Sequence, residues 1–159
     1  MKNRGICKRI IIESDLMRYG PSPKEGTEIA QRLTINDKGG VSFVGYAFPD
    51  GKACRHIRLN IGKDNSAEIL GFLYKCLTDS GEISFATDIG VWKVTIEHYE
   101  GKTIEVEASM TGGPSLNGRR VCDLIHDYIH IEGLDPFGGY REEYEEYIAD
   151  QIGSMHLHF

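Results

Sequence analysis

The first half of the chain alternates apolar and polar residues with the two-residue period of β-strands. In one such run Leu33 and Ile35 fall on the same side of the pattern, separated by Thr34. Glycine-containing turns at residues 37–40 and 49–52 separate neighbouring runs, as is typical of β-hairpins. The pattern predicts strands at residues 6–13, 28–36, 41–48 and 53–61, with a loop at 14–27.

The spacing of apolar residues changes to a helical period at Asn65, which forms a capping-box-like start with Glu68. This first helix is expected to end near Gly81. Alternation then returns, and Glu100-Gly101 is predicted to join two paired strands. The later pattern predicts an extended piece at 83–86, strands at 92–97 and 104–110, a second helix at about 118–131, and a third, amphipathic helix at 140–152.

These elements predict an α+β fold in a single domain spanning residues 1–159. Strands joined by short turns and interrupted by single helices indicate a mainly antiparallel sheet of about six or seven strands, with two or three helices packed on one face. Residues 133–159 form a C-terminal acidic amphipathic helix and tail in this prediction. A chain of 159 residues is long enough to fold without disulfides or a structural metal.

The composition favours a cytoplasmic protein without a membrane span. The basic start at residues 1–4 is followed by no apolar stretch of signal-peptide length. No run approaches the roughly 20 apolar residues that a membrane helix needs. Four cysteines are spread singly along the chain, a pattern that predicts free buried thiols: Cys7, Cys54, Cys76 and Cys122.

The excess of acidic residues is concentrated near the C-terminus. The net charge is −6, and residues 132–150 alone contain seven acids and one base. The remainder of the chain therefore has equal numbers of acids and bases. A basic cluster at residues 2–9 is too small for a nucleic-acid interface, so no direct nucleic-acid binding is expected.

The predicted third helix is the candidate partner-binding segment. Tyrosines at helical spacing provide large contact area with polar tips, and the acids between them attract a basic protein surface. The alternative is that the tyrosines pack on the protein's own sheet and the acids only increase solubility. The candidate residues are Tyr140, Glu142, Glu143, Tyr144, Glu145, Glu146, Tyr147 and Asp150.

A candidate metal site comes from His126 and His130, which are four residues apart in the predicted second helix, with Asp123 beside them. The segment resembles the His-Glu-x-x-His pattern of metalloproteases, with an aspartate in the glutamate position. His156 or His158 is a candidate third ligand. The alternative is a pair of solvated surface histidines, and in that case the protein needs no cofactor.

Residues 113–118 match the spacing of the glycines in a phosphate-binding loop and precede the predicted second helix. Gly113, Ser115 and Arg119 are therefore candidate anion-binding residues. Arginines replace the Lys-Ser/Thr pair that such a loop requires, which excludes a nucleotidase and leaves either a weak anion site or an ordinary loop. The pattern contains no nucleophile motif, so no catalytic residue is predicted.

Three short segments, at residues 32–36, 40–46 and 85–92, resemble parts of small α+β proteins of Gram-positive bacteria or their mobile elements. The resemblance implies no activity and no binding residue. The leading hypothesis is a non-enzymatic interaction module, such as an inhibitor, immunity or anti-defence protein, that masks a basic partner surface. The alternatives are a metal-dependent hydrolase and a domain that binds a small molecule or anion. The pattern leaves the oligomeric state open.

Overall fold

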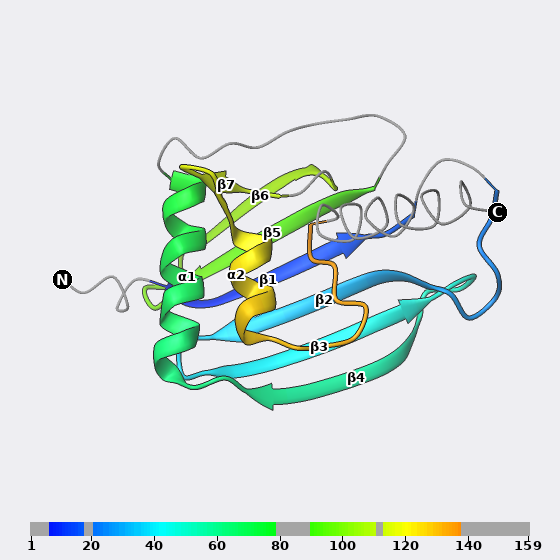
Figure 1. The fold of residues 1–159 in the computed structure, drawn as a ribbon, viewed down its shortest axis with the longest axis horizontal. Coiled ribbons are helices and arrows are strands. Elements are labelled where there is room, and N and C mark those ends of the chain that lie inside the picture. The colour runs from blue at the N-terminus through cyan, green and yellow to red at the C-terminus, as the bar shows by residue number, and fades with distance from the viewer. Residues whose placement is uncertain (1–6, 18–20, 79–89, 111–112, 138–159) are drawn as a thin grey trace, which may run out of the picture.

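Six strands form one antiparallel sheet, which is the framework of the molecule (Figure 1). The computed structural model describes residues 7–17, 21–78, 90–110 and 113–137. The strands lie in the order β4-β3-β2-β1-β5-β6, so β4 and β6 are the two edges. Their bounds are β1 Cys7–Asp15, β2 Glu28–Asn36, β3 Gly40–Ala47, β4 Lys52–Asn60, β5 Val91–His98 and β6 Thr103–Ser109.

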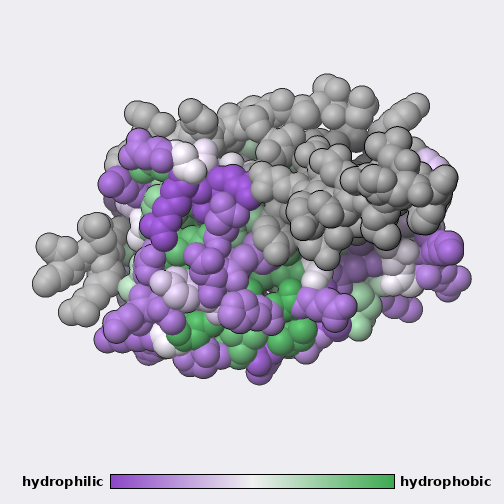
Figure 2. Space-filling view, in the orientation of Figure 1, coloured by the Kyte–Doolittle hydropathy of each residue, from purple (hydrophilic) through white to green (hydrophobic). Residues whose placement is uncertain are grey.

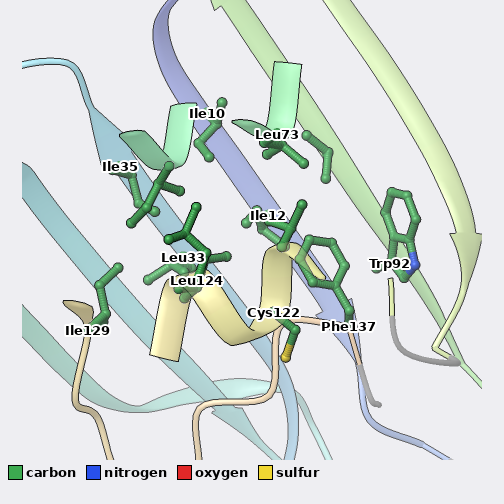
Figure 3. Close-up of a cluster of buried hydrophobic side chains, with 14 of the residues drawn as sticks. Ile10, Ile12, Leu33, Ile35, Leu73, Trp92, Cys122, Leu124, Ile129 and Phe137 are labelled. Atoms are coloured by element: carbon green, nitrogen blue, oxygen red, sulfur yellow. The ribbon is translucent and has the colours of Figure 1, made fainter. Parts of the chain in front are cut away.

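Two helices, α1 (Lys63–Thr78) and α2 (Val121–Tyr128), lie on the same face of this sheet (Figure 1). Inward-facing strand residues and the apolar stripes of both helices form the core between them. Each aliphatic side chain removed from water contributes roughly 1.5–3 kcal/mol to this packing. The core includes Ile10, Ile12, Leu33, Ile35, Leu73 and Leu124 (Figure 3), each at most 1% exposed.

The predicted α+β class and mainly antiparallel sheet are confirmed, with two helices in the described ranges. The predicted third helix at 140–152 and the extended piece at 83–86 lie outside the described residues. Helix α1 begins at Lys63, two residues before the predicted start. The reason is local, because Gly62 has a φ of 88° and its N–H binds Asn60 Oδ1 at 2.8 Å, which turns the chain earlier.

The second helix is shorter than its apolar pattern predicted. Residues 118–120 are not helical, because Asn117 and Gly118 have φ values of 54° and 79° and form the turn of a small hairpin. The strands of this hairpin are β7 (Ser115–Leu116) and β8 (Arg119–Arg120). At the other end the helix stops at Tyr128, since Ile129 is extended with φ −118°.

Three of the four cysteines are buried free thiols as predicted, but Cys54 is exposed on edge strand β4. The prediction for Cys54 was wrong because an edge strand has a neighbour on one side only. No helix in the described ranges has both the length and the apolar character that crossing a membrane requires.

Candidate functional site

Residues 129–137 follow α2, and their apolar side chains are part of the core. Ile129 and Phe137 are completely buried (Figure 3). The Phe137 ring meets Trp92 edge to face, with centroids 5.1 Å apart. Gly113 makes room for this ring, because a Cβ there would lie 2.3 Å from Phe137 Cγ. Phe137 thus fixes the end of residues 129–137 on the core.

Two buried polar side chains of the sheet hold the same segment. Gln31 Nε2 donates to Gly133 O at 2.7 Å, and Gln31 Oε1 accepts from Asp135 N at 2.8 Å. Ser14 Oγ donates to Pro136 O. Because burying an unpaired polar group is costly, these bonds allow the irregular segment to cross the apolar face of the sheet.

The ion pair between Arg55 and Glu28 positions Gln31, because Glu28 also accepts a hydrogen bond from Gln31. Arg55 Nε lies 2.7 Å from Glu28 Oε2, and Gln31 Nε2 lies 2.7 Å from Glu28 Oε1. Burial alone would raise the pKa of Glu28, but the hydrogen bonds from Arg55 and Gln31 together outweigh it and keep the pKa below its usual value. Gly45 leaves space for this carboxylate, since a Cβ at Gly45 would lie 1.9 Å from Glu28 Oε2.

Regular alternation in residues 28–36 places Glu28 on the side opposite Leu33 and Ile35, away from the core, and this prediction was wrong. A register shift between Glu28 and Ala30 turns the carboxylate toward the helix-covered face. Gln31 itself had a usable signal, because it shares the inward side of the pattern with Leu33 and Ile35. An inward polar residue in a strand indicates a buried hydrogen-bonding role, which the sequence interpretation overlooked.

The predicted partner-binding residues lie outside the described residues, so the structure places none of them. They are Tyr140, Glu142, Glu143, Tyr144, Glu145, Glu146, Tyr147 and Asp150. What the structure does establish is the point from which they start. The chain reaches residue 138 from Phe137, which is 0% exposed.

The sheet face opposite the helices is polar and has no cover among the described elements. Its register aligns Arg32, Glu13, Lys93 and Glu107 in one row across four strands. Lys93 Nζ lies 3.8 Å from Glu13 Oε1. An open hollow of about 330 Å³ lies over this row and is also lined by Tyr46. Since positive and negative groups alternate, their fields largely cancel at the surface.

A serine and a histidine also meet on this open face. Ser42 Oγ and His56 Nε2 are 3.2 Å apart across β3 and β4. In a serine nucleophile site the base is usually oriented by a carboxylate, and among the described residues no carboxylate is bonded to His56. Both side chains stand on an exposed strand pair, so the contact is a cross-strand hydrogen bond. The sequence interpretation did not anticipate it.

The candidate metal residues do not share one helical face. His126 lies in α2, whereas His130 follows the end of that helix and is exposed. Burial lowers the pKa of His126, and Asp123 is held by Arg120 through a 2.7 Å ion pair. Within the described ranges, no three His, Cys, Asp or Glu side chains are grouped closely enough to bind a metal ion. His156 and His158 lie outside these ranges.

The candidate anion-binding residues lie in different surroundings from those predicted. Ser115 belongs to the small hairpin, and Gly113 packs under Phe137. The Arg119 guanidinium lies 3.1 Å from Oε2 of the Glu68 carboxylate. The other carboxylate oxygen, Oε1, accepts a 2.6 Å hydrogen bond from the Tyr128 hydroxyl. The Tyr128 and Arg119 contacts hold the pKa of Glu68 below its usual value. Arg119 therefore links α1 to the hairpin before α2.

Three of the four thiols have a raised pKa, which lowers their nucleophilic character at neutral pH. Burial raises the pKa of Cys7 to about 11, and that of Cys76 also to about 11. The pKa of Cys54 is raised as well, by desolvation and then by the neighbouring Glu28 carboxylate. The thiol, not the reactive thiolate, is thus the main form of all three.

No protein-family model matches the chain, and no curated protein matches it.

Proposed function

We propose that the protein is a non-enzymatic interaction module that binds a basic surface of another protein through residues 140–150. One observation carries this proposal. The whole net charge of −6 comes from residues 132–150, while the rest of the chain has equal numbers of acids and bases. A negative field confined to one short segment speeds encounter with a positive partner and orients it.

In the described part of the chain, arginines hold four of the acidic side chains in close ion pairs. These pairs are Arg9–Glu97, Arg55–Glu28, Arg119–Glu68 and Arg120–Asp123. The buried Phe137 holds the chain on the core shortly before residues 140–150.

The chemistry of the segment favours a partner that otherwise binds nucleic acid. Closely spaced carboxylates compete with phosphates for the same lysines and arginines. Tyrosines between the acids add apolar contact area with hydroxyl groups at the ends. We therefore assign the protein to the class of inhibitors, immunity proteins or anti-defence proteins that mask a basic surface.

The test is affinity capture from lysate of the native host at low and at high salt, followed by mass spectrometry. We expect one basic protein that is released by salt. A variant with Glu142, Glu143, Glu145 and Glu146 changed to lysine is expected to lose it.

The matched control reverses four exposed acids elsewhere, namely Glu25, Asp64, Glu100 and Asp127, for the same change in net charge. This control is expected to retain the partner. Equal loss in both variants would show a general charge effect, and retention by the first variant would exclude the 140–150 segment as the binding site.

A further inference from the structure

The two edge strands of the sheet carry opposite charge. Strand β4 contains two arginines, a lysine and a histidine but no acid, whereas β6 contains Glu105 and Glu107 but no base. Each edge is paired on one side only, β4 with β3 and β6 with β5, among the described elements (Figure 1). Unpaired edges expose backbone groups that can pair with another strand.

The side chains of these strands alternate in a matching way. On the open face β4 presents Arg58 and β6 presents Glu105, both exposed. On the helix-covered face Leu59 remains partly exposed, as does Ile104 at 36%. Figure 2 shows apolar side chains along the lower rim of this face, over the β3–β4 side of the sheet.

The backbone hydrogen bonds show which groups point outward. Ile61 N donates to Gly39 O at 2.9 Å, so alternate residues of β4 counted from Ile61 bind β3, and the residues between them point away. Likewise His98 N donates to Lys102 O at 2.9 Å, which sets the alternation in β6. The outward residues are therefore His56, Arg58 and Asn60 in β4, and Thr103, Glu105 and Glu107 in β6.

We propose that β4 of one copy of the chain pairs antiparallel with β6 of a second copy. One register satisfies both faces and the backbone together, with Arg58 opposite Glu105. It places His56 opposite Glu107, Ile57 opposite Val106, Leu59 opposite Ile104, and Asn60 opposite Thr103. The outward backbone groups then face each other, and each such pair exchanges two hydrogen bonds. Ion pairs form on one face and aliphatic contacts on the other.

The number of strands permits this pairing. Six strands alternate in direction across the sheet, so β4 and β6 run in opposite directions. A second copy can continue the antiparallel order with its helices on the same face. Like-to-like pairing is disfavoured, because two β4 strands bring bases together and two β6 strands bring acids together. The contact is thus head to tail, which extends to further copies rather than closing as a two-fold dimer.

The test is sedimentation velocity of the full chain over a wide concentration range at moderate salt. We expect the mean mass to rise with concentration. The variants Arg58→Glu and Glu105→Arg, each measured alone, are expected to raise the dissociation constant about tenfold or more. An equimolar mixture of the two is expected to associate again, because each β4 then meets a β6 of opposite charge.

Recovery in the mixture also shows that both variants are folded. The matched control is Arg32→Glu, which makes the same charge change on the open face of an internal strand. It is expected to associate like the unmodified chain. The proposal fails if the unmodified chain stays monomeric at every concentration, if Arg58→Glu associates normally, if the mixture does not recover, or if Arg32→Glu weakens association equally.

Discussion

Gln31 is expected to be the polar residue on which the attachment of residues 129–137 depends most. The change Gln31→Met keeps the side-chain volume almost constant but removes both hydrogen-bonding ends. Three bonds are lost, to Gly133 O, to Glu28 Oε1 and from Asp135 N. The side chain is 3% exposed, so water cannot replace these partners without a rearrangement.

The expected loss in the free energy of unfolding depends on whether each former partner of Gln31 finds another hydrogen bond in the variant. Asp135 is 2% exposed, and leaving its N–H unpaired costs about 1–3 kcal/mol. Gly133 is exposed and its carbonyl can bind water, so this loss is nearer 0.5 kcal/mol. Glu28 keeps its bidentate contact with Arg55 and loses about 1 kcal/mol. The sum is about 2.5–4.5 kcal/mol, a large part of the 5–15 kcal/mol typical of a domain.

The measurement is urea unfolding followed by the fluorescence of Trp92, which is the only tryptophan of the chain and packs on Phe137. The matched control is Arg32→Met, the next residue on β2, which is exposed and is expected to change stability by less than about 0.5 kcal/mol. A loss below about 1 kcal/mol for Gln31→Met, with an unchanged urea slope, would refute the role of this residue.

Three further changes test other parts of the structure. Gly45→Ala places a Cβ 1.9 Å from Glu28 Oε2 and is expected to cost about 1–3 kcal/mol in urea unfolding, whereas Gly71→Ala, in open space on α1, is expected to stabilise. Burial lowers the pKa of His126, so the unfolded chain binds more protons and stability falls as pH drops below about 6.5; His126→Gln is expected to reduce this slope in urea titrations across that range. Phe137→Ala is expected to cost about 3–5 kcal/mol by calorimetry, and a cost under about 1 kcal/mol would contradict its burial in the core.

The sheet was predictable from the sequence because its alternation is regular. In β4, Ile57 and Leu59 lie on one face and His56 and Arg58 on the other, as regular alternation requires. Such alternation follows from the strand period alone and needs no knowledge of neighbours. The order of the strands was not predictable in the same way, since β1 pairs with β5 across a long stretch of sequence.

The errors arose where one residue overrides a longer pattern. The apolar spacing around 118–131 is helical, but the Asn117-Gly118 turn delays the helix. At the start of β2 a register shift turns Glu28 inward, and alternation has no means of indicating a bulge. The contacts of Arg55 could not be predicted either, because its partners, Glu28 and the Phe43 ring, lie on two other strands. Contacts of this kind depend on tertiary packing and leave no local signal.

The two proposals are connected through charge. Each copy carries a net charge of −6, so two copies repel each other over distances of about one Debye length, roughly 8–10 Å at physiological salt. The attraction between β4 and β6, in contrast, is short-ranged and arises only when the two strands are in contact. A basic partner bound to residues 140–150 would neutralise much of this repulsion and thereby favour the edge pairing. Because coupling between two binding events is reciprocal, copies already paired at their edges are expected to bind the basic partner more tightly than single copies do.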